Sequence, residues 1–258
     1  MIQIDNITLW QGDCLNLMCE IPDKSVDMIL CDLPYGTTDC KWDTVIPFKS
    51  LWEQYNRIIK NNGAIVLFGS EPFSTYLRMS QINEYKYDWI WIKNNCTGFA
   101  HSKNMPMKKR ELISVFSKAP IGHVSQLGDK RMVYNPQGII YEEKVKTVNR
   151  NKDSVLGARP NQCGKQYKSC SNLPTNILEF PRDKKTIHNT QKPVPLLEYL
   201  IKTYTNENET VLDNCMGSGS TGVACINTNR NFIGIELDDT YFEIAKKRIE
   251  EANSKSKT

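Results

Sequence analysis

The sequence predicts an α/β fold: one mixed, mostly parallel sheet with helices on both faces, interrupted by a long insertion. Three observations predict it. Strand-length apolar runs alternate with helix-length amphipathic segments near both ends of the chain. A glycine-rich turn at residues 214–222 follows one such run and leads into a helix. Residues 119–185 lose this periodicity and gain Gly, Asn, Lys and Pro over a stretch too long for an ordinary connection.

The N-terminal part begins the alternation. Apolar runs bounded by turn residues predict strands, and longer amphipathic runs predict helices. The predicted strands are residues 7–10, 26–31, 64–68, 88–92 and 111–117, and the predicted helices are residues 48–60 and 72–81.

Periodicity returns after the insertion. A helix is predicted at residues 193–204, with Leu196, Leu197, Leu200 and Ile201 on one side. Strands are predicted at 210–212 and 231–235, a charged amphipathic helix at 241–252, and a disordered tail at 254–258. We therefore expect residues 1–118 and 186–258 to form one domain, with residues 119–185 inserted into it.

The composition excludes several classes of protein. With 258 residues, 40% of them hydrophobic, the chain has enough material for one large α/β domain. No apolar run reaches the about 18 residues that cross a bilayer, and the N-terminus lacks the pattern of a signal peptide. The nine cysteines include no C-x-x-C pair, which favours reduced thiols in a cytoplasmic protein and argues against a metal site.

Positive charge is concentrated in one part of the chain. The net charge is only +4, yet residues 100–187 hold 17 Lys and Arg against seven Asp and Glu. A basic segment on an acidic body is typical of a surface that binds a polyanion such as nucleic acid. The alternative is a lysine-rich insertion that is merely solvated.

The glycine-rich turn has the pattern of a nucleotide-cofactor loop. Gly217, Gly219 and Gly222 follow the G-x-G-x-x-G spacing, in which glycines let a ligand approach the backbone and a helix N-terminus presents free amides. Glu236 closes the next predicted strand, where a carboxylate can bind both hydroxyls of a ribose. The loop fits a nicotinamide cofactor and S-adenosylmethionine equally, because both carry an adenosine. A simple strand-to-helix turn is the structural alternative.

A second motif, Asp32-Leu33-Pro34-Tyr35, follows the predicted strand at residues 26–31. Open α/β sheets bind their ligands at this carboxyl edge. The motif offers a carboxylate, backbone carbonyls and a flat ring, which together suit a heterocycle that carries an exocyclic amine. Alone, it would equally fit a Pro-Tyr turn with Asp as a cap. It has no evident role in hydride transfer.

Together the two motifs resemble those of the amino-group DNA methyltransferases that use S-adenosylmethionine. Their order resembles the beta class, with the catalytic motif first, an insertion next and the cofactor loop last. Further similar segments are Gly12-Asp13 and residues 91–95, 110–111, 188–193 and 229–236. The resemblance covers residues 7–118 and 186–250. It implies a Rossmann-like methyltransferase fold in which residues 119–185 are a target-recognition insertion.

The resemblance also implies a reaction and its residues. The reaction is methyl transfer to the N6 amine of an adenine that is flipped out of duplex DNA at a specific sequence, because Asp32 stands where cytosine N4 enzymes commonly have Ser. The catalytic residues would be Asp32, Leu33, Pro34 and Tyr35, with Tyr35 stacked on the base and the Asp32 carboxylate and a backbone carbonyl accepting the amine hydrogens. The cofactor-binding residues would be Asp13, Lys192, Asp213, Met216, Gly217, Ser218, Gly219 and Glu236. No metal is required.

Candidate DNA contacts are basic residues in or beside the insertion. They are Lys108, Lys109, Arg110, Arg131, Arg150, Arg159 and Lys168. Enzymes of this kind are sometimes homodimers and sometimes accompany a restriction endonuclease, and the sequence leaves both open.

Three rival functions stay open: the glycine-rich loop with Glu236 supports the oxidoreductase, and two departures from the family pattern motivate the inactive homologue. Leu33 replaces the usual first proline of the catalytic motif, and Cys215 replaces the usual aromatic residue of the cofactor loop. The rivals are a cytosine-N4 or RNA amino methyltransferase, a nicotinamide-dependent oxidoreductase, and an inactive DNA-binding homologue.

Overall fold

The computed structural model describes residues 1–36, 43–147, 164, 166–182 and 191–257. It divides into a large unit, Met1–Asn135 with Asn176–Thr258, and a small unit, Pro136–Thr175. The small unit lies within the predicted insertion, residues 119–185, and spans fewer residues than that prediction. The difference arises because Ala119, Met132 and Leu178 are buried in the hydrophobic core of the large unit.

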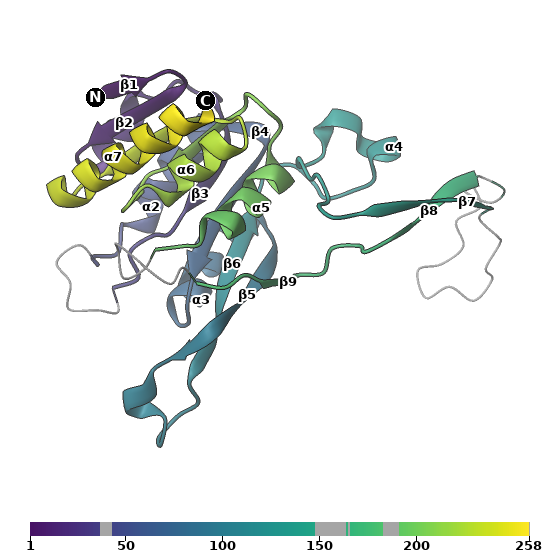
Figure 1. Cartoon of the computed structure of the whole chain (residues 1–258), viewed down its shortest axis with the longest axis horizontal. Helices are drawn as coiled ribbons and strands as arrows, with labels where there is room; N and C mark the ends of the chain where they lie inside the picture. The colour runs from purple at the N-terminus through teal and green to yellow at the C-terminus, as the bar shows by residue number, and fades with distance from the viewer. Residues whose placement is uncertain (37–42, 148–163, 165, 183–190, 258) are drawn as a thin grey trace. The chain divides into compact units, whose positions relative to one another are not determined.

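The large unit is built on a nine-stranded sheet with the order β1-β2-β11-β10-β3-β4-β6-β5-β9 (Figure 1). Its strands are β1 (Ile2–Ile4), β2 (Ile7–Gln11), β3 (Val26–Cys31), β4 (Ile59–Gly69), β5 (Tyr85–Thr97), β6 (Lys108–Phe116), β9 (Ile177–Glu179), β10 (Thr210–Asp213) and β11 (Asn231–Glu236). Strands β2, β11, β10, β3 and β4 run parallel, whereas β1 and β6 pair antiparallel with their neighbours. The predicted mixed, mostly parallel sheet is confirmed.

Helices cover both faces of this sheet. Side chains of α5 (Val194–Tyr204), α6 (Ser220–Asn227) and α7 (Asp239–Ser256) share one buried cluster, and those of α1 (Cys14–Leu17), α2 (Phe48–Ile58) and α3 (Phe73–Ser80) share the other. Short helices η1 (Met18–Glu20), α4 (Val124–Leu127) and η3 (Gly128–Lys130) complete the connections. Strand β3 explains the two clusters, because its alternate side chains point to opposite faces and all six are buried.

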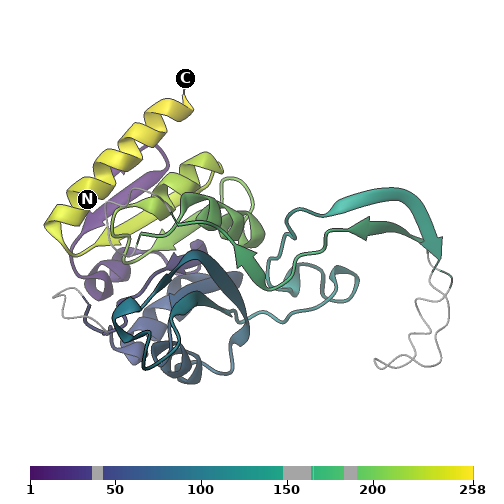
Figure 2. The same ribbon diagram turned by 60° about the horizontal axis from the view of Figure 1, so that its bottom comes forward.

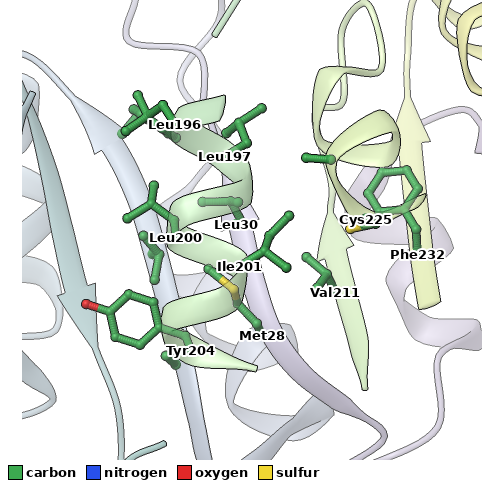
Figure 3. Close-up of a cluster of buried hydrophobic side chains, with 14 of the residues drawn as sticks. Met28, Leu30, Leu196, Leu197, Leu200, Ile201, Tyr204, Val211, Cys225 and Phe232 are labelled. Carbon is green, nitrogen blue, oxygen red and sulfur yellow. The ribbon is translucent and has the colours of Figure 1, made fainter. Parts of the chain in front are cut away.

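Helix α5 forms the centre of one core layer. Its Leu196, Leu197, Leu200 and Ile201 share one buried cluster with Met28 and Leu30 of β3 and Val211 of β10 (Figure 3). The apolar residues recur three and four positions apart, which places them on one side of the helix. This packing fixes the segment that begins just before the helix, at Lys192 and Pro193, against the carboxyl ends of the central strands.

Strands β5 and β6 are longer than predicted and extend beyond the sheet as a hairpin. The hairpin points downward in Figure 1 and comes forward in Figure 2. Its tip contains the short helix η2 (Phe99–His101). Cross-strand hydrogen bonding, rather than an apolar pattern, holds this extension together, which explains why periodicity ended the predicted strands early.

The small unit is a two-stranded antiparallel pairing of β7 (Ile140–Thr147) and β8 (Gln166–Ser171). Every residue of β7 is exposed. Gly138 precedes β7 and Asn172 follows β8, and the Asn172 side-chain amide donates to the Gly138 carbonyl at 2.7 Å.

The predicted disorder of residues 254–258 is wrong for residues 254–257. Helix α7 continues to Ser256, because its C-terminal turns contact the N-terminal hairpin. The Asn253 amide and the Lys257 ammonium both bind the Asp5 carboxylate, at 2.6 and 2.5 Å. Thr258 lies outside the described residues.

No helix within the described ranges is long and apolar enough to cross a membrane.

Candidate active site

A cavity of about 440 Å³ opens at the carboxyl ends of the parallel strands. Both sequence motifs line it, since Asp32 follows β3, Asp213 ends β10 and Glu236 ends β11. These parallel strands all end at the same edge of the sheet, so the loops that follow them lie close together. The volume is typical of a small-molecule or cofactor site.

All four residues of the predicted catalytic motif line this cavity. The Tyr35 hydroxyl donates to Asp32 Oδ1 at 2.5 Å, and the Tyr35 ring packs on Phe73 with 4.9 Å between centroids. Leu33 is buried in the core, which anchors the motif between two partly exposed neighbours, Asp32 and Pro34. The motif therefore presents a carboxylate and backbone carbonyls beside a held aromatic ring.

Lys192 joins this motif to a second carboxylate. Its ammonium lies 2.5 Å from Asp32 Oδ2 and 2.9 Å from Glu111 Oε1. Glu111 also contacts Lys93 Nζ at 2.6 Å and the Tyr35 hydroxyl at 3.3 Å. These five residues form what we call the charge network. It places Lys192 beside the catalytic motif, whereas the sequence predicted a contact with the cofactor, which stays a prediction.

The sequence did not predict that Lys93 and Glu111 belong to the site. Both lie in segments that resemble the family, but their spacing gave no role. They meet because β5 and β6 pair antiparallel, with Trp91 opposite Glu111. The sequence offered one signal, a carboxylate at the start of the predicted strand 111–117, because a carboxylate that is buried at such a position requires a partner.

Burial and charge act in opposite directions in this network. Burial raises the pKa of Asp32, and Lys192 only partly offsets the rise. Burial also works to raise the pKa of Glu111, but Lys192 and Lys93 outweigh it and hold that pKa below its ordinary value. Burial works to lower the pKa of Lys192, but the two carboxylates outweigh it and raise that pKa. Lys192 is therefore a fixed cation, and Asp32 is a carboxylate with enhanced basicity.

The glycine-rich loop is held in place by the Glu236 carboxylate. Glu236 accepts from the backbone amides of Gly217 at 2.8 Å and Asp238 at 2.9 Å, which holds its carboxylate at the cavity wall. Gly217 and Gly219 adopt positive φ values of 50° and 78°, and a Cβ on Gly219 would meet the backbone of Ala245 at 3.0 Å. Burial raises the pKa of Glu236.

The remaining predicted cofactor residues lie around the same cavity. Asp213 accepts from the Thr221 hydroxyl at 2.6 Å, and its burial raises its pKa to about 6. Met216 is buried, and the Ser218 hydroxyl donates to Gln191 at 3.3 Å. Asp13 caps helix α1 by accepting from the amides of Leu15 and Asn16. It therefore has a structural role whether or not it contacts the cofactor.

Cys215, which replaces the usual aromatic residue, lies in a group of thiols at the cavity wall. The Asn214 amide lies 3.5 Å from both Cys14 Sγ and Cys215 Sγ, while its carbonyl accepts from the Tyr55 hydroxyl at 2.5 Å. Burial raises the pKa of the neighbouring Cys31 thiol to about 12, so this thiol is protonated at neutral pH. Among the residues that the structure describes, no group of three His, Cys, Asp or Glu side chains could hold a metal ion.

The predicted DNA-contact residues fall in three places. Lys108, Lys109 and Arg110 are exposed on the extended part of β6, and Arg131 follows η3 in the large unit. Lys168 is exposed on β8 of the small unit. Arg150 and Arg159 lie outside the described residues.

Comparison with known proteins identifies relatives over nearly the whole chain. The family model for N6/N4 methyltransferases, described as DNA methylase, matches residues 26–247. Type II methyltransferase M.HpaI of Haemophilus parainfluenzae is 26% identical over 257 residues, covering 93% of this chain and 73% of that protein. DNA adenine methyltransferase YhdJ of Escherichia coli (strain K12) is 26% identical over 264 residues, covering 95% of this chain and 83% of that protein.

Solved structures agree with this likeness. The crystal structure of the M1.HpyAVI-SAM complex has a TM-score of 0.61 at 27% identity, covering 94% of this chain and 99% of that chain. The cytosine-N4-specific PvuII DNA methyltransferase has a TM-score of 0.65 at 14% identity, covering 98% of this chain and 93% of that chain. At that identity the second likeness shows the fold alone.

Proposed function

The chain belongs to the N6/N4 DNA methylase family, and from this premise we propose that it methylates the exocyclic N6 amine of adenine within a specific sequence of duplex DNA, using S-adenosylmethionine. The observation that carries the proposal is the convergence of Asp32, Tyr35 and Glu236 on one cavity. One end of the cavity presents acceptors for an amine, and the other presents a carboxylate for a ribose. The family assignment leaves no support for a nicotinamide-dependent oxidoreductase.

The residues of the cofactor end fit S-adenosylmethionine. The Glu236 carboxylate has two oxygens, and each accepts from a backbone amide and retains a lone pair for a further donor. It can therefore accept from the ribose hydroxyls while it orders the glycine-rich loop. When bound, the sulfonium supplies a methyl group that is already activated for displacement.

The residues of the catalytic end hold the acceptor nitrogen. One Asp32 oxygen contacts the Lys192 ammonium and the other accepts from the Tyr35 hydroxyl, which fixes the orientation of the carboxylate. Each oxygen retains a lone pair that can accept a further hydrogen bond. With the Leu33 or Pro34 carbonyl, Asp32 accepts the two amine hydrogens, which favours a pyramidal nitrogen and offsets its developing positive charge. The amine nitrogen held in this way would accept the methyl group by in-line displacement, with the neutral thioether as the leaving group. Asp32, whose pKa burial raises, takes the released proton.

The target base must leave the helix to reach this cavity. A base stacked inside a duplex cannot approach a methyl donor held between Asp32 and Glu236, so we propose that the adenine is flipped out and stacks on Tyr35. We also propose that the small unit, which carries Lys168, belongs to the region that reads the target sequence, together with other residues of the 119–185 insertion. The relatives named Type II methyltransferases suggest a place in a restriction-modification system with a companion endonuclease. Cytoplasmic location and a homodimer stay predictions.

One experiment tests the reaction and the base. Labelled methyl transfer from S-adenosylmethionine to unmethylated duplex DNA is followed by digestion to nucleosides and mass analysis. N6-methyladenine is the expected product, and sequencing of the modified DNA then gives the recognition site. N4-methylcytosine would keep the family but overturn the role assigned to Asp32. Cofactor binding without any methylated DNA would contradict the proposal and favour an RNA substrate or an inactive DNA-binding homologue.

A further inference from the structure

The hairpin of β5 and β6 continues past the edge of the sheet as a free two-stranded finger, defined here as residues 93–110. Strand β4 pairs with β6 only as far as Leu112, and β9 pairs with β5 only as far as Ile92. Beyond these points the two strands pair with each other, with Thr97 opposite Lys108, and the Asn94 side chain at the start of the finger accepts from the Arg182 backbone amide at 3.0 Å. Figure 1 shows the hairpin extending away from the rest of the large unit.

The finger is cationic, with Lys93 at its start and its other basic residues from Lys103 onward. Residues 93–110 contain five Lys and Arg and no Asp or Glu. Lys103, Lys108, Lys109 and Arg110 are all exposed. A purely cationic two-stranded ribbon repels copies of itself and attracts a polyanion, so its charge favours the phosphate backbone over another protein surface.

An aromatic residue is exposed at the tip. Phe99 opens helix η2 directly after Gly98, which adopts a φ of +89°, and 81% of its surface is accessible. Met105 and Met107, on the returning arm, are 50% and 37% exposed. Exposure of an apolar ring to water is unfavourable. Phe99, at the end of a basic ribbon, is similar to the apolar side chains that DNA-binding proteins insert as wedges between base steps.

The root of the finger is part of the charge network. Lys93 is the first residue of the finger, and Glu111 directly follows its last residue. These two side chains contact each other at 2.6 Å, and Glu111 holds Lys192 against Asp32. The finger therefore starts at the point where the amine of the target base would be held.

We propose that residues 93–110 grip duplex DNA through their basic side chains and that Phe99 enters the stack at the position vacated by the flipped adenine. The proposal rests on the function proposed above and adds to it a named wedge and a phosphate-binding surface. A wedge stabilises the extrahelical state of the base by replacing the stacking that the base loses. Nothing in the cofactor end of the site depends on it.

The decisive variant is Phe99→Ala, assayed on two duplexes that contain the mapped recognition sequence. In one duplex the target adenine is paired, and in the other it faces an abasic site and is already unstacked. We expect kcat/KM on the paired duplex to fall on the order of tenfold to a hundredfold, the value of one lost base–aromatic stack. Activity on the abasic duplex should stay near that of the wild type. Tyr76→Ala removes an exposed ring from α3 and should change neither rate.

A fluorescence measurement separates flipping from chemistry. With 2-aminopurine in place of the target adenine, wild-type protein should raise the emission on binding, and Phe99→Ala should raise it less at saturating protein. Wild-type rates for Phe99→Ala on the paired duplex would overturn the wedge, as would an equal loss on both duplexes. Failure of the wild type to make N6-methyladenine would instead overturn the proposed function itself.

The basic surface is tested by its salt dependence. Replacing Lys103, Lys108 or Lys109 with Gln should weaken DNA binding on any sequence and reduce the slope of log K against log salt by about one per residue. Lys255→Gln, on the exposed end of α7, is the matched control. Unchanged slopes in all three finger variants would overturn the phosphate contacts.

Discussion

The ammonium of Lys192 lies 2.5 Å from Asp32 Oδ2, although 160 positions separate the two residues in the chain. Helix α5 makes this contact possible, because its buried leucines fix the start of the helix against the strand that precedes Asp32. Glu111 holds the other side of the same ammonium at 2.9 Å. Lys192 opposes the rise that burial causes in the pKa of Asp32, so the pair influences the charge of the catalytic motif at the place where an amine must be bound.

Replacing Lys192 with Met should move the acid limb of the pH profile of kcat/KM to higher pH. Burial already raises the pKa of Asp32, and the variant removes the cation that opposes the rise. Activity at a fixed pH should then fall about tenfold for each unit by which the pKa exceeds that pH. Lys192→Arg should keep the limb near its wild-type position. Lys60→Met, which breaks the Lys60–Asp27 pair outside the cavity, should not move it. An unshifted limb in Lys192→Met would contradict this role.

Replacing Glu111 with Gln should shift the same limb in the opposite direction, since the negative charge of Glu111 raises the pKa of Asp32. The change should also destabilise the fold by about 3 kcal/mol, because it removes one partner from a buried set of charges. The folded-state pKa of Glu111 lies below 4.5, so its contribution is present at neutral pH and is lost as the pH falls through that pKa.

Urea unfolding at several pH values checks the prediction for Glu111. The difference between wild type and Glu111→Gln should be largest near neutrality and should shrink in acid. Glu53→Gln, at an exposed position of α2, supplies the comparison. A difference that grew in acid would show that the charge of Glu111 is not stabilising.

Replacing Glu236 with Ala should weaken S-adenosylmethionine by tenfold to about a hundredfold, the range expected for a lost charged hydrogen bond. Burial raises the pKa of Glu236, so cofactor affinity should begin to fall at a pH above 4.5 as the carboxylate gains a proton. Calorimetric titration of the wild type across pH tests both points. Glu243→Ala removes an exposed carboxylate of α7 and should bind the cofactor normally. Equal affinity in Glu236→Ala would exclude the ribose contact.

Replacing Tyr204 with Phe should lower the free energy of unfolding by about 1–3 kcal/mol. The Tyr204 hydroxyl accepts from Trp89 Nε1 at 2.6 Å and lies 2.9 Å from the Tyr87 hydroxyl (Figure 3 shows its position at the end of α5). Without it the buried indole N–H has lost its acceptor. Denaturant midpoints measure the change, with exposed Tyr76→Phe as the control. A wild-type midpoint would mean that Trp89 finds another acceptor.

Elements with strong apolar patterns were predictable from the sequence. Strand β3 was predicted with its observed bounds, and helix α5 to within one residue, because burial on both faces or on one side leaves a clear period in the sequence. The finger beyond Ile92 was not, since its residues pair through the backbone and face solvent. The end of α7 was also missed, because Asp5 receives contacts from residues about 250 positions away.

The site was predictable where motifs are contiguous and not where the fold assembles it. Asp32, Tyr35 and Glu236 line one cavity, as their positions after strands predicted. The sequence assigned no role to Lys93 and Glu111, which meet only through strand pairing, and assigned Lys192 to the cofactor. Charge networks of this kind depend on burial, and burial of a single charged residue leaves no periodic trace in a sequence.

In the proposed reaction, the Asp32 carboxylate holds the amine that receives the methyl group. The most direct measurement is the single-turnover rate of methyl transfer to the mapped DNA site by wild type and Asp32→Ala, with cofactor affinity measured on both. We expect N6-methyladenine from the wild type, and a loss of at least a hundredfold in the variant, about 2.7 kcal/mol, with cofactor binding retained. Near-normal methylation by a folded, cofactor-binding Asp32→Ala protein would contradict this role of Asp32.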